Sequence, residues 1–224
     1  NTVGQRDLKR LLGYSSTENV GIAGLGLGVG CLGLAWGNSS LVVVGFAGGL
    51  LHVLNHAFFK CQLFYAAGSV YQAAHTVDME RLGGLSRLMP WTAASFLLGG
   101  VAISALPPLN GFTSEFVIYS GLFNGQAIGA WAQVALAVAA AGLAFVGAVS
   151  ALSITRAFGV VFLGSPRDVS IEAPHEVSRW MLAPTLAHAA GVVVLGVAPV
   201  LGLMLVEGSA RLALAGLPGA DAAA

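Results

Sequence analysis

Three side chains that can carry a proton are spaced four residues apart within the apolar segment LLHVLNHAFFKCQLF. They are His52, His56 and Lys60. On an α-helix, residues four apart are turned by only about 40°, so the three share one face and extend roughly 12 Å along the axis. That separation suits relay through water better than direct contact. Because charged groups within apolar spans are costly and usually functional, the pattern indicates a proton path buried in a membrane.

Glu115 is a second ionisable residue in an apolar region, and it follows the interruption LPPLNG at 106–111. Two prolines and a glycine cannot continue a regular helix, so two half-helices are predicted. Glu115 would then lie near the start of the second half, where the helix dipole favours a carboxylate. Broken helices at membrane depth usually line an aqueous cavity. The alternative is a surface loop in which Glu115 only caps the next helix.

Two further ionisable residues, Lys9 and Glu18, lie near the start of the first apolar segment. Lys9 belongs to the charged run QRDLKR and is either a relay member or an interfacial anchor. Glu18 is either a helix N-cap or a membrane-embedded partner. We therefore include Lys9 among the candidate relay residues and treat Glu18 as an accessory candidate.

Composition requires a membrane setting for these residues. Hydrophobic residues make up 56% of the chain and charged residues only 9%, and the mean hydropathy is +0.81. So few charges cannot cover the surface of a soluble domain of this size. Cys31 and Cys61 lie apart in apolar segments, which argues against a disulfide framework or a zinc site.

Apolar runs of about 20 residues predict one all-α transmembrane domain, a polytopic helix bundle covering 1–224. The chain begins without Met or a signal-peptide pattern, so we interpret it as the C-terminal part of a longer protein. Small residues in GLGLGVG at 24–30 suit close helix packing rather than nucleotide binding. The expected spans are 11–36, 41–74, 91–124 broken at 106–111, 131–162 and 180–205.

Basic residues sort unevenly between the two sides of this topology. If 91–124 is one broken span, seven lie on one side and only Arg211 on the other. The positive-inside rule makes the seven-residue side cytoplasmic, which places the N-terminal end inside and the C-terminal end outside. The seven are Arg6, Lys9, Arg10, Arg81, Arg87, Arg167 and Arg179.

Three motifs occur together in the order expected for a known family. They are DLKRLLGYSSTENVG, LLHVLNHAFFKCQLF and RLGGLSRLMPWTAASFLLGGVAISALPPLNGFTSEF. They resemble the C-terminal half of antiporter-like proton-translocating subunits of respiratory complex I, membrane-bound hydrogenases and multisubunit cation/proton antiporters. The resemblance is strong over about 5–165 and weak over the final span. STEN at 16–19 and SEF at 114–116 are most similar to the branch of hydrogenase-4 component B and formate hydrogenlyase subunit 3.

The resemblance implies two inverted repeats, each with a discontinuous helix, of which this chain contains most of the second. Its central lysine falls on Lys60, its neighbouring histidines on His52 and His56, and its ionisable group at the broken helix on Glu115. The lysine of the DLKR motif falls on Lys9. Some members carry lysine where this chain has Glu115, so the charge at that position differs between branches.

The leading hypothesis is a membrane subunit that relays protons through these residues, driven by redox chemistry in a peripheral arm and other membrane subunits. No cofactor, metal or nucleic-acid motif is found in the sequence, so electrons are expected to travel in partner subunits. The first alternative is a subunit of a Na⁺/H⁺ antiporter without redox partners. A structural scaffold and a haem-bearing subunit, with His188 as a ligand, are the remaining alternatives.

Overall fold

The computed structural model describes residues 2–124, 129–171 and 174–214. Within these ranges the chain is helical, apart from connecting segments and one isolated β-bridge between Asp7 and Asp78. This confirms the predicted all-α helix bundle. The α-helices of these ranges are α1 Leu8–Trp36, α2 Ser39–Ala74, α3 Pro90–Ile103, α4 Asn110–Asn124, α5 Ala130–Phe162, α6 Arg179–Val197 and α7 Pro199–Leu214.

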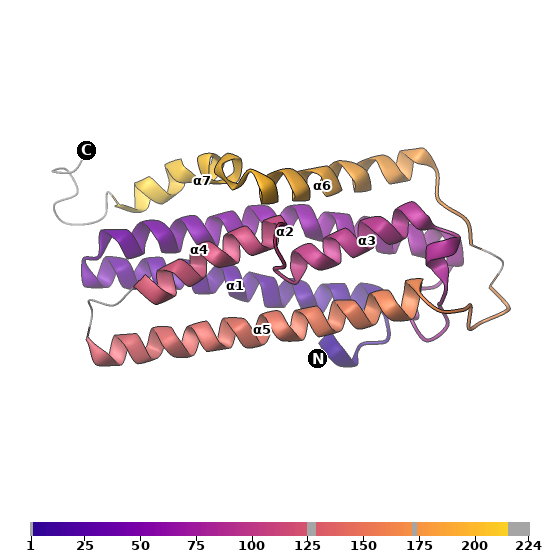
Figure 1. Cartoon of the computed structure of the whole chain (residues 1–224), viewed down its shortest axis with the longest axis horizontal. Helices are drawn as coiled ribbons and strands as arrows, with labels where there is room; N and C mark the ends of the chain where they lie inside the picture. Colours follow the sequence, from indigo (N-terminus) through magenta and orange to yellow (C-terminus); the bar gives the residue numbers. More distant parts are fainter. Residues whose placement is uncertain (1, 125–128, 172–173, 215–224) are drawn as a thin grey trace.

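Four of these helices, α1, α2, α5 and α6, are long and apolar enough to cross a bilayer. The helix α3 is shorter, and α4 continues in the same direction after an interruption (Figure 1). We call α3, the interruption and α4 together the broken span. The helix α2 has 36 residues, about 54 Å, which exceeds the roughly 30 Å thickness of the hydrocarbon core.

The helix α2 is the centre of the bundle. It packs against α1, α3, α4, α6 and α7, with α5 along one edge of the molecule and α6 and α7 along the opposite edge (Figure 1). Neighbouring helices therefore cover several faces of α2, and many of its side chains are buried. This arrangement explains how a helix of apolar composition can hold several polar side chains away from lipid.

Glycines bring α1 and α2 into close contact. A Cβ atom at Gly26 would lie 2.8 Å from the Cα atom of Gly49, and a Cβ atom at Gly45 would overlap the backbone of Gly30. Small residues allow this backbone approach, which van der Waals packing and lipid entropy favour within a membrane. The packing role predicted for the segment 24–30 is confirmed at Gly26 and Gly30, whereas a Cβ atom at Gly28 would meet nothing.

The broken span has its interruption at residues 104–109, two residues earlier than the sequence suggested. Ala105 has a φ of 51°, a left-handed conformation that ends α3, and prolines 107 and 108 follow. The helix α4 then begins at Asn110, so Asn110 and Gly111 belong to its first turn and not to the break. A buried hydrogen bond, described below, holds Asn110 in that position.

The last expected span, 180–205, is divided in the structure. The helix α6 ends at Val197, and α7 begins at Pro199 after Ala198, which has φ and ψ of −121° and 65°. Proline cannot donate the backbone hydrogen bond that a continuous helix needs there, and it disfavours helical geometry in the residue before it. The apolar run continues across this position, so hydropathy alone did not reveal the interruption.

The two polar connections, 75–90 and 163–179, meet the N-terminal segment at one end of the bundle. Arg81 Nε donates to Asp168 Oδ2 over 2.7 Å, and Met79 N donates to the Arg6 carbonyl over 2.8 Å. Hydrogen bonds from Ser170 and the Arg81 guanidinium hold the pKa of Asp168 well below its usual range, at about 2. The Asp168 carboxyl group is therefore ionised at neutral pH.

Exposed tryptophans mark both ends of the long helices. Trp91 and Trp180 are 60% and 83% exposed and lie at the first residues of α3 and α6, near the polar connections. Trp131 is 88% exposed and lies near the start of α5, at the other end, where α1 also ends with Trp36. Tryptophan is enriched at membrane interfaces, so the two sets are consistent with a bilayer between them.

Candidate functional site

The ladder predicted from the sequence lies on the inner part of α2. His52 and Lys60 are buried, with 1% and 5% of their surface exposed, and His56 is half-buried. His56 packs edge-on against Phe59, with 5.5 Å between the ring centroids. All three are shielded by α1, α4 and neighbouring side chains of α2, which places titratable groups in the interior of an apolar bundle.

Lys60 reaches across to α1. Its Nζ donates to the Leu12 carbonyl over 2.7 Å and to the Ser15 hydroxyl. The Ser15 hydroxyl in turn donates to the Leu12 carbonyl over 3.0 Å. These uncharged oxygens partly replace the water that a lysine ammonium loses on burial.

His52 connects α2 with the broken span. A hydrogen bond of 3.0 Å joins His52 Nδ1 and the hydroxyl of Ser114, the residue immediately before Glu115. Lys60 and His52, eight residues apart on one helix, therefore have partners on two different helices, α1 and α4.

Asparagines fix the start of α4 against α2. Asn55 Nδ2 donates to the Asn110 carbonyl over 2.7 Å, and Asn110 Nδ2 donates to the Asn55 carbonyl over 3.2 Å. Both residues have no exposed surface. This reciprocal pair holds the first turn of α4 at the depth of the histidines, and with it Ser114 and Glu115.

Glu115 lies in the second turn of α4 and is 6% exposed. It borders a cavity of about 230 Å³ between the interruption of the broken span and α5. Ser104 and Ala105 line this cavity from the break, Tyr119 from α4 and Gly147 from α5. A carboxyl group beside a cavity at a helix break is the arrangement expected where a broken helix meets water.

Glu18 lies on α1, one turn beyond Ser15, and is half-buried. Its carboxyl group is close enough to Lys60 and to Glu115 for an electrostatic interaction with each. Across the contact with α5 it faces the Ser150 hydroxyl. The accessory candidate therefore lies among the principal ones.

The structure does not bring Lys9 to the ladder. Lys9 is exposed, and its Nζ lies 4.3 Å from the centre of the Tyr71 ring. Tyr71 is eleven residues beyond Lys60 on α2, about 16 Å along the helix axis. Lys9 thus lies at the end of the bundle where the polar connections gather.

Unsatisfied polar atoms collect around the ladder. In the described ranges, eight buried side-chain nitrogen or oxygen atoms have no hydrogen-bond partner, and all lie on α1, α2, α4 or α5. Buried polar groups are normally paired with protein or with ordered water. Their concentration indicates sites for water along the ladder. They belong to Glu18, Asn19, His52, Asn55, His56, Gln62, Asn110 and Ser150.

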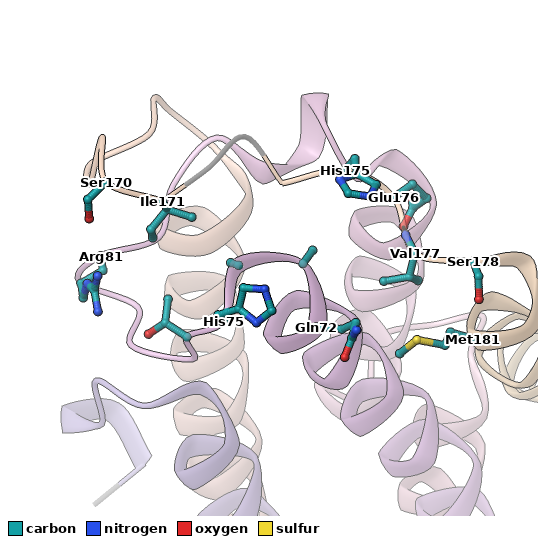
Figure 2. Close-up of a pocket in the computed structure, with 13 residues that line it drawn as sticks. Gln72, His75, Arg81, Ser170, Ile171, His175, Glu176, Val177, Ser178 and Met181 are labelled. Atoms are coloured by element: carbon teal, nitrogen blue, oxygen red, sulfur yellow. Dashed lines mark hydrogen bonds between the residues drawn. The ribbon is translucent and has the colours of Figure 1, made fainter.

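A second, larger cavity of about 650 Å³ lies at the end of α2 among the polar connections. Figure 2 shows Gln72 of α2 and His75, the residue after α2, on one side, and His175 and Glu176 of the segment before α6 on the other. His75 is fifteen residues beyond Lys60, about 22 Å along the axis. The cavity is therefore separate from the ladder.

His188, the residue considered as a haem ligand, contacts other side chains than His52 and His56. Its ring packs against Phe58 and Tyr65, with centroid distances of 5.8 and 5.3 Å, and its Nδ1 donates to the Pro184 carbonyl over 2.8 Å. None of these interactions involves His52 or His56. The surroundings are those of a packing residue.

Several residues of the site were not singled out from the sequence. Ser15, Asn55, Ser114 and Ser150 are polar residues in apolar segments, and Asn55 lies three residues after His52 on the same helical face. A polar residue at that position could have been recognised from the sequence as part of the site. For the serines the sequence offered none, because a membrane helix can satisfy a serine hydroxyl with its own backbone.

The fold and site together define a polytopic membrane protein with a row of ionisable side chains leading to a broken helix. A family model described as NADH:quinone oxidoreductase/Mrp antiporter, TM matches residues 1–144. The chain belongs to this family.

Individual relatives agree with that assignment. Hydrogenase-4 component B of Escherichia coli is 44% identical over 187 residues, 83% of this chain and 28% of the relative. Formate hydrogenlyase subunit 3 of the same organism is 43% identical over 169 residues, 75% of this chain and 28% of the relative. The chain thus spans less than a third of these relatives.

The fold is also that of a solved structure. A chain of the Mrp complex from Dietzia sp. superposes with a TM-score of 0.76 at 20% identity, over 93% of this chain and 43% of that chain. At this identity the match concerns the fold alone. The sequence resemblance to antiporter-like membrane subunits, including the hydrogenase branch, is confirmed.

Proposed function

We propose that this chain is part of a proton-translocating membrane subunit of a redox-driven complex. The observation that carries the proposal is the row of titratable groups on α2, in which His52 and Lys60 are buried and His56 is half-buried, with unpaired polar atoms gathered around it. Groups that can gain and lose protons, linked by water sites, are what a proton relay through an apolar bundle needs. Relatedness to hydrogenase-4 component B and formate hydrogenlyase subunit 3 supports the redox context.

In this proposal protons pass among Lys60, the two histidines and Glu115 at the broken span by relay through side chains and water. The cavity beside Glu115 then provides contact with water toward one side of the membrane. Lys9, at the end of the bundle, lies where protons would be taken up or where the chain would anchor to the interface. Redox cofactors would reside in partner subunits, including a peripheral arm. Redox chemistry in those subunits would drive the proton relay by electrostatic coupling.

The positive-inside rule orients the proposed subunit. By the positive-inside rule, the seven basic residues at or near the end with the polar connections support a cytoplasmic location for that end and for the N-terminal end of this chain. The C-terminal end lies on the opposite side of the cell membrane. Protons taken up at the cytoplasmic end would then move along α2 toward the broken span.

The second candidate is a cation/proton antiporter subunit without redox partners. The family description that matches this chain includes Mrp antiporters, and the same ionisable positions could exchange Na⁺ for H⁺. The two candidates differ in one measurable property, the requirement of proton movement for sodium.

The test is proton uptake by proteoliposomes that contain the full assembly, followed with an enclosed pH-sensitive dye during redox turnover. Lys60→Ala and Glu115→Gln are compared with wild type, with and without sodium. Each substitution is expected to slow proton transport on the order of 100-fold, because it removes a group that carries the proton. Glu207→Gln, an exposed carboxylate paired with Arg211, is the matched control and should transport normally.

Subunit composition is checked for every variant, and Lys60→Gln replaces Lys60→Ala if the smaller side chain prevents assembly. Wild-type transport in assembled Lys60 and Glu115 variants contradicts the relay. Transport that stops without sodium favours the antiporter candidate.

A further inference from the structure

The relay proposed above does not name the group that carries a proton from Lys60 to Glu115. Lys60 points toward α1, where it contacts Leu12 and Ser15, whereas Glu115 lies on α4. Glu18 of α1 is near both residues, because its carboxyl group is close enough to Lys60 and to Glu115 for an electrostatic interaction with each. Among the described residues, no other carboxylate interacts electrostatically with both Lys60 and Glu115.

The spacing on α1 explains how Glu18 comes to lie there. Leu12, Ser15 and Glu18 follow one another at three-residue intervals, so they occupy one side of the helix with a rise of about 4.5 Å per step. The first two already bind the Lys60 ammonium group. The third therefore continues the same polar strip by one turn, in the direction that leads away from the polar connections.

The surroundings of the Glu18 carboxyl group allow it to gain and lose a proton. The Ser150 hydroxyl of α5 is close enough to the Glu18 carboxyl group to interact with it. In the described part of the chain, however, Glu18 Oε1 and the Ser150 hydroxyl oxygen are both buried and make no direct hydrogen bond of normal geometry. A water molecule between them would satisfy both. A structural salt bridge would instead show Glu18 in direct contact with Lys60, but Lys60 Nζ is held by Leu12 and Ser15.

The charges favour transfer through this position. While Lys60 is an ammonium ion, its positive charge compensates a Glu18 carboxylate in an environment that penalises isolated charge. Once Lys60 gives up its proton, Glu18 and Glu115 remain as two neighbouring acids. Two like charges at close range repel, so a proton on either one relieves the repulsion and the pair can exchange it.

We propose that Glu18 is the intermediate proton carrier between Lys60 and Glu115, and that Ser150 positions its carboxyl group. A proton leaves Lys60 Nζ, which becomes an amine, and binds the Glu18 carboxylate, which becomes a carboxylic acid. The same proton then passes to the Glu115 carboxylate, and Glu18 returns to its ionised form. No electrons move and no other covalent bond changes. This inference rests on the proton-relay function proposed above.

The experiment uses the full assembly in proteoliposomes with Glu18→Gln, Glu18→Asp and Ser150→Ala, beside Lys60→Ala and Glu115→Gln. Glu18→Gln keeps the size of the side chain but cannot take up the proton, and is expected to slow transport on the order of 100-fold. Glu18→Asp keeps a carboxyl group and should retain a substantial part of the rate. Ser150→Ala should slow transport less than Glu18→Gln, and Glu207→Gln is the charge-matched control.

A second readout separates a carrier from a packing residue. Difference infrared spectra recorded between resting and turning-over assemblies should contain the C=O stretching band of a protonated carboxylic acid that shifts in D2O. The band should disappear in Glu18→Gln and move in frequency in Glu18→Asp. If Glu18→Gln does not assemble, the frequency in Glu18→Asp decides the matter, and an unmoved band overturns the proposal.

Three outcomes are distinguished. Loss of transport in Glu18→Gln, with recovery in Glu18→Asp and the expected change of the band, supports Glu18 as carrier. Wild-type transport in Glu18→Gln, with loss in Lys60→Ala and Glu115→Gln, overturns the assignment of Glu18 and leaves the relay intact. Wild-type transport in all three removes the relay itself and this inference with it.

Discussion

At the scale of single residues, the site depends on how a lysine ammonium group is accommodated inside an apolar bundle. Lys60 is 5% exposed and is bound by a backbone carbonyl and a hydroxyl of α1, not by a carboxylate in direct contact. Uncharged partners stabilise the ammonium form without locking it into an ion pair. A lysine held in this way can still release its proton, which a relay requires and a permanent salt bridge would oppose.

Replacing Ser15 by alanine tests this account of Lys60. The substitution removes one of the two partners of the ammonium group, and loss of a hydrogen bond to a charged buried group costs about 1.5–3 kcal/mol. We expect lower thermal stability of the purified assembly and slower proton transport. Ser69→Ala is the control, because Ser69 is also buried but its hydroxyl donates to the Tyr65 carbonyl of its own helix. Equal behaviour of the two variants would contradict the role given to Ser15.

At the scale of helices, the positions of the relay groups depend on the approach of α1 to α2. Glycines on both helices let the backbones approach closely, as at Gly26 and Gly49, and further along the same pair of helices Lys60 reaches Leu12 and Ser15 of α1. The interruption of the broken span has the complementary effect on α4. It ends α3 at Ile103 and lets a new helix begin at Asn110, where the pair with Asn55 places Ser114 and Glu115 beside α2.

Alanine substitutions at two glycines of α1 separate close packing from helix propensity. Gly26→Ala introduces a Cβ atom 2.8 Å from the Cα atom of Gly49, and overpacking of this kind typically costs about 1–3 kcal/mol. Gly28→Ala introduces a Cβ atom into open space and should be neutral or slightly stabilising, since alanine favours the helix by about 1 kcal/mol. Thermal unfolding of the assembly in detergent measures both, and similar losses would refute the glycine contact.

At the scale of the whole molecule, the polar segments gather at one end of the bundle. The N-terminal segment and both long polar connections meet at one end, tied by Arg81 to Asp168 and by Arg156 to the Val3 and Gln5 carbonyls. The other end holds the junction of α1 with α2, the end of α4 and the start of α5. A bilayer across the middle leaves the large cavity of Figure 2 at the end with the basic residues.

Cysteine labelling tests the proposed orientation. Val169 is 97% exposed in the connection before α6, and Ser209 is exposed on α7 near the opposite end. In a background without Cys31 and Cys61, Val169→Cys is expected to react with a membrane-impermeant maleimide only in inverted vesicles, and Ser209→Cys only in right-side-out vesicles. The reverse pattern would overturn the cytoplasmic placement of the N-terminal end, and labelling of both on one side would contradict an odd number of crossings.

Much of this protein followed from the sequence by itself. Hydropathy determined that the chain is a membrane helix bundle, helical periodicity placed His52, His56 and Lys60 on one face, and the two prolines revealed the broken span. The motifs identified the family. These features are local, because they depend on residues within a few turns of one another, and local patterns are the ones that a sequence displays directly.

Only the tertiary structure decided which groups meet. It joined Lys60 to Leu12 and Ser15, which lie 48 and 45 residues away in the chain, and it brought Glu18 within electrostatic reach of both Lys60 and Glu115. It also left Lys9 at the surface and divided the last expected span at Ala198, where the apolar run concealed the effect of Pro199. Such contacts depend on how close and at what rotation whole helices pack, and helix packing is decided by all facing side chains together rather than by any segment alone.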